Sequence, residues 1–120
     1  MDKRKHKRFT TRLHVKLCSP STMCWGILCD VSQNGLFIKS NQDLATGEII
    51  DMEIFMPDNT SCLLRGIVRR KAEFPDSYRK HGLGVQLTGK DTAYEHFLRR
   101  LGEKMKTPVH ELSTVSHKEV

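Results

Sequence analysis

Two short groups of residues in this chain have types and spacing suited to binding a ligand. Arg4 and Arg8 form an R-x-x-x-R pair within a strongly basic N-terminal segment. After 21 intervening residues comes a D-x-S-x-x-G run, in which Asp30, Ser32 and Gly35 hold the defined positions. Because one group is cationic and the other offers a carboxylate and a hydroxyl, they are candidates for two sides of one site.

The arginines supply positive charge and planar hydrogen-bond donors. A guanidinium presents a fork of N–H groups that matches two phosphate oxygens, or the O6 and N7 edge of guanine. It can also stack flat on a base. Arg4 and Arg8 are therefore suited to a ligand that combines phosphate with a purine.

The D-x-S-x-x-G run supplies groups for another edge of a base. The carboxylate of Asp30 only accepts hydrogen bonds, so it complements the N1 and N2 donors of guanine. The hydroxyl of Ser32 can donate or accept. Gly35, which follows Asn34, permits a positive φ and a close approach of the backbone to a ligand. A purely structural alternative is a hairpin turn in which Asp30 caps local N–H groups.

The basic N-terminal segment carries the net charge of the whole chain. Residues 1–16 contain seven basic residues and one acidic residue, a balance of +6, and the formal net charge of the chain is also +6. The rest of the chain, with 13 basic and 13 acidic residues, is neutral. Such a segment attracts anions; the alternative is a solvated basic tail with no ligand.

Composition restricts the class of protein. The 120 residues are enough for one domain. Apolar runs fall short of the ~20 residues of a membrane helix, and the N-terminus lacks the apolar region of a secretory signal, so we expect a cytoplasmic protein with no membrane span and reduced cysteines. The four cysteines lack C-x2-C spacing and the six histidines are scattered, so no metal site is expected. We recognise no catalytic triad, paired carboxylates or phosphate loop, and therefore expect neither catalytic residues nor an enzyme.

The elements that position these residues are mostly strands. Period-two alternation in some segments, short apolar runs in others and the turn residues between them predict six short strands, which favours a small antiparallel barrel or sandwich. The predicted strands cover residues 13–17, 24–29, 35–39, 50–56, 62–71 and 82–87. The D-x-S-x-x-G run then lies where the second strand turns into the third. From Asp91 onward, apolar residues recur at three- and four-residue steps, which predicts a helix with Asp91 as its N-cap, packed over one end of the sheet.

Together these features resemble the PilZ domain family. The resemblance rests on the R-x-x-x-R pair, the later D-x-S-x-x-G run between early strands of an all-β domain, and two late strands at residues 65–70 and 82–87, and it covers about residues 3–101. It implies an all-β fold: a six-stranded antiparallel β-barrel with a C-terminal α-helix and flexible termini. The implied organisation is a basic ligand-binding arm over residues 1–10, the barrel with its helix over 11–106, and a disordered tail over 107–120.

The resemblance also implies a ligand, the bacterial second messenger cyclic di-GMP, and no other cofactor. The residues that match the family's two motifs are Arg4, Arg8, Asp30, Ser32 and Gly35. Further candidates for the same site are Lys3, Asn34 and Arg70. Lys3 stands where many relatives have another arginine, which retains the charge but loses the flat bidentate fork.

The implied mechanism is a clasp. The dianionic ligand bridges the arm to the barrel, and several charge-assisted hydrogen bonds offset the entropy cost of ordering the arm. The changed surface then signals to an unknown protein partner in motility, biofilm formation or virulence, with the domain a monomer or weak dimer and no DNA bound.

Two alternatives remain open. A small barrel with a basic arm is also typical of single-stranded nucleic-acid binders, although the neutral barrel and the missing aromatic ladder argue against one. The other alternative is a PilZ domain that binds no ligand and acts only as a protein adaptor, although both motifs are intact.

Overall fold

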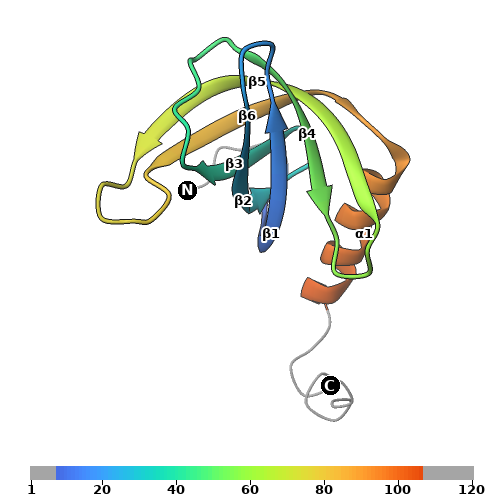
Figure 1. The fold of residues 1–120 in the computed structure, drawn as a ribbon. Helices are drawn as coiled ribbons and strands as arrows, with labels where there is room; N and C mark the ends of the chain where they lie inside the picture. The colour runs from blue at the N-terminus through green and yellow to red at the C-terminus, as the bar shows by residue number, and fades with distance from the viewer. Residues whose placement is uncertain (1–7, 107–120) are drawn as a thin grey trace.

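Six antiparallel strands and one helix make up residues 8–106, the part of the chain that the computed structural model describes (Figure 1). The strands are β1 (Phe9–Cys18), β2 (Met23–Val31), β3 (Gly35–Ser40), β4 (Ile49–Phe55), β5 (Ser61–Glu73) and β6 (His81–Lys90). The helix α1 (Thr92–Lys106) follows the last strand. All six strands and the helix predicted from the sequence are therefore present, and the all-β fold class is confirmed.

The strands close into a barrel rather than a sandwich. Their order around the barrel is β1-β2-β3-β6-β5-β4. Closure occurs at β1, because Val15 lies opposite Gly26 of β2 on one side and opposite Ile54 of β4 on the other. Each described strand thus has two paired neighbours. The start of β1, residues 9–14, pairs only with β2, and the end of β5, residues 68–73, pairs only with β6.

Apolar side chains that point inward fill the barrel. In β4, Ile50, Met52 and Ile54 are buried, while Asp51 and Glu53 between them face outward. This is the period-two pattern that predicted the strand from the sequence.

Helix α1 lies across one end of the barrel, next to the β4–β5 hairpin (Figure 1). Tyr94 is fully buried and Phe97 nearly so, with ring centroids 6.2 Å apart. Leu98 and Leu101 pack against the same core. The apolar stripe of the sequence is therefore the face that docks the helix on the barrel.

Asp91 begins the helix, as its position in the sequence predicts. Its Oδ1 accepts a hydrogen bond from the backbone N–H of Tyr94 at 3.0 Å, the contact expected of an N-cap. Its Oδ2 accepts another from the backbone N–H of Leu63 on β5 at 2.8 Å. One carboxylate therefore starts the helix and ties it to the barrel wall.

The cysteines are free thiols, as the sequence predicts. Cys24 and Cys62 are buried, and burial raises the pKa of Cys62 to about 11. A thiol held protonated in this way is an unreactive core residue.

The predicted arm and tail fall largely on residues 1–7 and 107–120, which lie outside the described residues. Strand β1 begins at Phe9, within the segment assigned to the arm. The organisation into 1–10, 11–106 and 107–120 stays a prediction. Among residues 8–106, α1 is too short and too polar to cross a membrane.

Candidate functional site

A cavity of about 520 Å³ lies where the start of β1, the β2–β3 turn, β5 and β6 meet. This volume falls within the range of roughly 300–1,000 Å³ typical of small-molecule sites. The cavity is lined by all of the predicted site residues that the structure describes: Arg8, Asp30, Ser32, Asn34, Gly35 and Arg70. The other two candidates, Lys3 and Arg4, lie outside the described residues.

Strand pairing brings the start of β1 to the turn. Phe9 pairs with Val31, the last residue of β2, and Arg8 immediately precedes Phe9. Since the turn begins directly after Val31, the basic segment and the D-x-S-x-x-G run must meet at this end of the β1–β2 pair.

Ser32 builds the turn. Its backbone N–H donates to the Gly35 carbonyl at 2.9 Å. The Gly35 N–H donates to Ser32 Oγ at 3.1 Å, and that hydroxyl lies 3.3 Å from the Gly35 carbonyl, to which it donates. The side chain of Ser32 therefore closes the turn, whereas the sequence left open a turn capped by Asp30. Because only 5% of its surface is exposed, the main role of Ser32 is to set the shape of the site.

Gly35 is needed for close packing rather than for an unusual backbone angle. Among the glycines that the structure describes, Gly47 alone has a positive φ. A Cβ atom at Gly35 would lie 3.2 Å from the carbonyl oxygen of Val85 on β6. The expectation that Gly35 would use a positive φ is therefore wrong. Its missing side chain lets the start of β3 lie against β6.

Three consecutive basic residues of β5, Arg69, Arg70 and Lys71, line the cavity together. In a regular strand, neighbouring side chains point to opposite faces. Here the β5–β6 register shifts between Val68 and Arg70, and such a bulge re-aims side chains. The Nε of Arg69 donates to Gln86 Oε1 at 2.8 Å, which orients its guanidinium.

Of these three residues, only Arg70 was predicted from the sequence. The signal for the other two was the run itself, Arg-Arg-Lys at the end of a predicted strand. This signal was insufficient because side chains of a regular strand alternate between its two faces, so three neighbours are not expected to share one. The bulge that brings them together arises from pairing with β6, which the sequence does not reveal.

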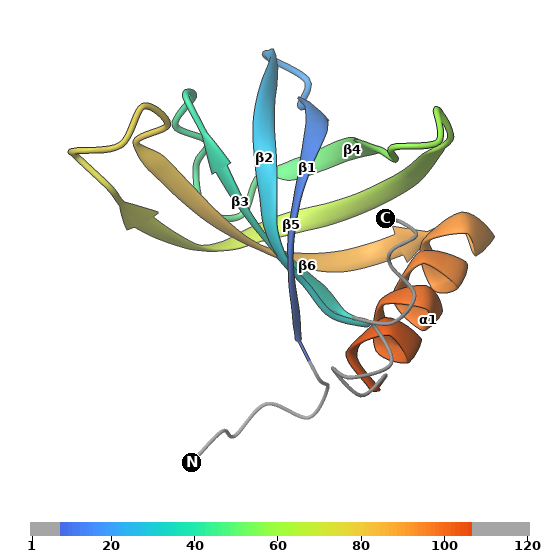
Figure 2. The same ribbon diagram turned by 90° about the horizontal axis from the view of Figure 1, so that it is seen from below.

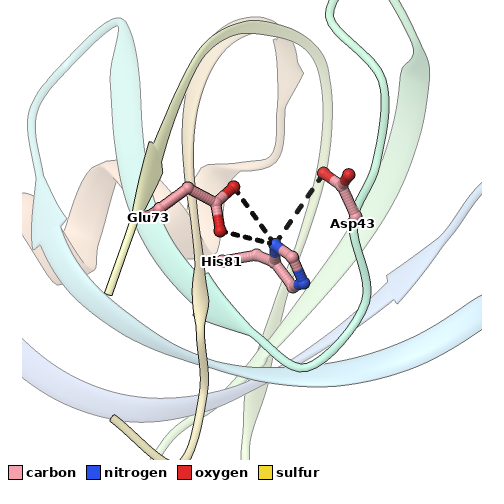
Figure 3. Close-up of side chains that lie close together, drawn as sticks. All are labelled: Asp43, Glu73 and His81. Carbon is pink, nitrogen blue, oxygen red and sulfur yellow. Dashed lines mark hydrogen bonds and ion pairs between the residues drawn. The ribbon is translucent and has the colours of Figure 1, made fainter. Parts of the chain in front are cut away.

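Lys71 also belongs to a polar cluster with Asp43, Glu73 and His81, of which only Lys71 lines the cavity. Figure 3 shows the His81 ring between the two carboxylates. Its Nδ1 lies 3.3 Å from each oxygen of Glu73 and 3.9 Å from Asp43 Oδ1. The hydrogen bond from Lys71 to Asp43 holds the pKa of that carboxyl below its ordinary value. The cluster ties a cavity-lining cation to the β3–β4 loop.

The residue types of this cluster can also ligate a metal ion, with the ligand atoms of Asp43, Glu73 and His81 within 4.8 Å of one another. Because Lys71 already neutralises Asp43, we interpret the group as an ion-pair network. The sequence does not indicate this cluster, because Glu73 and His81 are brought opposite each other only by the β5–β6 register. The absence of a metal site stays a prediction.

The sequence of this chain matches a known protein family, and its fold matches solved structures. A family model described as PilZ domain matches residues 2–103. No curated protein matches the chain by sequence.

Several solved structures share the fold. The Bacillus subtilis inhibitor of motility, MotI/DgrA, is 16% identical with a TM-score of 0.71; the match covers 88% of this chain but 52% of MotI, so the chain spans about half of its length. The PilZ domain of Escherichia coli YcgR, solved with c-di-GMP, is 14% identical with a TM-score of 0.68, over 88% of this chain and 95% of that domain. The PilZ domain of CeSA from a cellulose-synthesizing bacterium is 15% identical with a TM-score of 0.55, over 82% and 98% of the two chains. At these identities the matches show a common fold.

Proposed function

The chain belongs to the PilZ domain family, and on this premise we propose that it binds cyclic di-GMP in the cavity between β1, the β2–β3 turn, β5 and β6. The family is one of cyclic di-GMP receptors, and its domains bind ligands or partners rather than catalyse reactions. The observation that carries the proposal is that one cavity is lined both by Arg8 of the R-x-x-x-R pair and by Asp30, Ser32 and Gly35 of the D-x-S-x-x-G run.

The charges of the cavity fit a ligand with two phosphates and two guanines. Arg8 lies at the side formed by β1, while Arg69, Arg70 and Lys71 come from β5. Guanidinium groups bind phosphate oxygens through paired N–H donors and stack on bases. Asp30 adds an acceptor suited to the N1 and N2 donors of guanine. Cations for phosphate together with one carboxylate for a base edge favour a guanine nucleotide over a simple anion.

Arg4 and Lys3 complete the site in this proposal, as parts of an arm that closes over the ligand. Arg4 precedes Arg8 by one R-x-x-x-R step, so both lie on the segment that leads into β1. Ligand binding orders this arm against the barrel, with charge-assisted hydrogen bonds offsetting the lost conformational freedom. Asn34 lies at the lip of the turn, exposed to the ligand.

The output of the bound state is a changed surface read by a protein partner. We place this signalling in the bacterial cytoplasm, where a cyclic dinucleotide is available, with control of motility, biofilm formation or virulence as the process. The domain then works as a ligand-operated adaptor and not as an enzyme. Ordering a segment on ligand binding is a common form of such a switch.

Calorimetric titration of the full chain with cyclic di-GMP tests the proposal, with GTP and cyclic di-AMP as matched ligands. We expect saturable binding of cyclic di-GMP alone. A chain that ignores all three nucleotides but binds a protein partner would be a ligand-free adaptor. A chain that instead shifts random RNA or DNA, with strong salt dependence, would be a nucleic-acid binder. Either result would overturn the proposal.

A further inference from the structure

The carbonyl oxygens of the β2–β3 turn are held by a single segment from the other end of the chain. Each acceptor is a backbone carbonyl of the D-x-S-x-x-G run, and each donor lies near the end of β6 or in the first turn of α1. The three hydrogen bonds are Tyr94 Oη to Ser32 O at 2.6 Å, Lys90 Nζ to Gln33 O at 2.6 Å, and Leu87 N to Asn34 O at 2.9 Å. These hydrogen bonds hold the turn that lines the cavity, and the turn lies next to α1 (Figure 2).

The bond from Tyr94 is the buried one of the three. The Tyr94 side chain is fully buried, and this burial raises the pKa of its phenol, so the hydroxyl stays protonated and remains a donor. The carbonyl that receives it belongs to Ser32, whose own side chain is committed to closing the turn. Every polar group of Ser32 is therefore used to fix the turn in one shape.

The position of the Tyr94 hydroxyl is itself set by the docking of α1. Asp91 caps the first helical turn at the Tyr94 N–H and holds β5 through Leu63. The ring of Phe97 packs beside that of Tyr94. The cation of Lys90 lies 3.8 Å from Glu95, so the second anchor is also connected to the first turn of the helix.

We propose that Tyr94 is a positioning residue for the ligand, which fixes the D-x-S-x-x-G turn through the Ser32 carbonyl and couples ligand binding to the docking of α1. This inference rests on the proposed function. Tyr94 does not line the cavity. It acts through the turn, whose shape determines where Asp30 and Gly35 stand relative to the ligand.

The coupling follows from linkage. A ligand that binds best to the anchored turn stabilises the docked helix, and a docked helix raises the affinity for the ligand by the same factor. Removal of the hydroxyl would leave the Ser32 carbonyl buried without its partner, and the turn would move to find another. Ligand binding at one end of the barrel is thereby transmitted to α1, which is the element available for reporting it to a partner.

The test replaces Tyr94 with phenylalanine, which keeps the ring and removes only the hydroxyl. We expect Tyr94→Phe to weaken cyclic di-GMP binding about three- to tenfold, the scale of one hydrogen bond. Without ligand, the amide NMR signals of residues 32–35 should shift. With ligand, slower hydrogen exchange in the first turn of α1 should appear in the wild type and diminish in the variant.

Two control variants separate positioning from general destabilisation. Tyr78→Phe removes a hydroxyl from a tyrosine that is 80% exposed. Ile50→Val removes one core methylene from β4, a strand that does not line the cavity. Both should bind as the wild type does and leave the turn signals in place. If Tyr94→Phe does not fold, Lys90→Met provides a surface variant of the same anchor, with a smaller shift in the same direction expected.

Three results would overturn the inference. The first is wild-type affinity with unshifted turn signals in Tyr94→Phe, or in Lys90→Met if only that variant folds. The second is an equal loss of affinity in Ile50→Val, and the third is ligand-induced protection from hydrogen exchange that does not reach α1. If the wild type binds no cyclic di-GMP, the proposed function fails. The ligand-free NMR spectra would then still decide whether the hydroxyl fixes the turn.

Discussion

Thr10 of β1 lies directly opposite Asp30 of β2 in the antiparallel register. This pairing explains how Arg8 and the D-x-S-x-x-G run, separated by 21 residues, come to share a cavity. Because the strands are antiparallel, the chain that precedes Thr10 runs past the end of β2, where the turn begins. Arg8 lines the cavity for that reason, and Arg4 is placed four residues further along the same segment. The spacing of the two motifs is therefore a property of the β1–β2 hairpin.

Truncation of the arm arginines should weaken ligand binding strongly. We expect Arg8→Ala and Arg4→Ala each to cost roughly 1.5–3 kcal/mol of binding free energy, the usual scale for a hydrogen bond to a charged group. Arg65→Ala is the matched control, since Arg65 pairs with Asp51 at 2.7 Å and lies outside the cavity lining. Calorimetry with cyclic di-GMP measures all three. Wild-type affinity in both arm variants would rule out the clasp.

A side chain at Gly35 should disturb the contact between β3 and β6. The Cβ of Gly35→Ala would stand 3.2 Å from the Val85 carbonyl, a backbone atom with little freedom to move. We expect a loss of about 1–3 kcal/mol in the free energy of unfolding, as for other overpacked sites, together with weaker ligand binding. Gly89→Ala is the control, because its Cβ would make an ordinary contact at 3.7 Å. Urea denaturation that finds the two variants equally stable would contradict this account of Gly35.

The ion pair between Lys71 and Asp43 should compete with the ligand for the lysine. Asp43→Asn removes the carboxylate partner and should raise cyclic di-GMP affinity about two- to threefold at low salt, with the gain fading as salt screens the charges. Lys71→Met should lower affinity instead. Asp51→Asn, which breaks the ion pair with Arg65 away from the cavity, should change nothing. Titrations at two salt concentrations measure the effect, and an unchanged affinity in Lys71→Met would remove this lysine from the site.

Burial of Cys62 should make the fold less stable at high pH. Its pKa is raised from the ordinary 9.0 to about 11, chiefly by desolvation. A group whose pKa is higher in the folded state stabilises fully below the unfolded value and loses that contribution as pH rises through the folded one. The free energy of unfolding should therefore fall between about pH 9 and 11. Part of this slope should disappear in Cys62→Ala and persist in Cys18→Ala, as urea denaturation at pH 8 and 10.5 would show.

The strands were predictable from the sequence as short apolar runs between turn residues, and some of them alternate between core and surface. Ile50, Met52 and Ile54 show this in β4. Local alternation cannot specify which strands pair, and the pairing of β3 with β6 joins segments far apart in the chain. The choice between barrel and sandwich therefore depends on whether β1 pairs with β4, which the structure shows. From the sequence, only the resemblance to a family favoured the barrel.

The candidate site was predictable where its residues form local motifs, as Asp30, Ser32 and Gly35 do. Its remaining parts depend on tertiary contacts. Tyr94 falls in the apolar stripe that predicted the helix, and its ring does pack on the core. Its hydrogen bond to the Ser32 carbonyl joins residues 62 positions apart in the sequence, which no local pattern indicates. The sequence suggested a positive φ at Gly35, which the backbone does not adopt. Its lack of a side chain is needed instead because the Val85 carbonyl of β6 lies close by.

An NMR titration of the isotope-labelled full chain with cyclic di-GMP tests the central claim most directly. The account predicts that the amide signals of Arg8, residues 30–35 and residues 69–71 shift together and saturate, because these segments line one cavity. The same titration with cyclic di-AMP should leave them in place. Unmoved signals at saturating ligand, or shifts gathered instead around the exposed Trp25 of β2 and its ring neighbour Phe55 of β4, would contradict it.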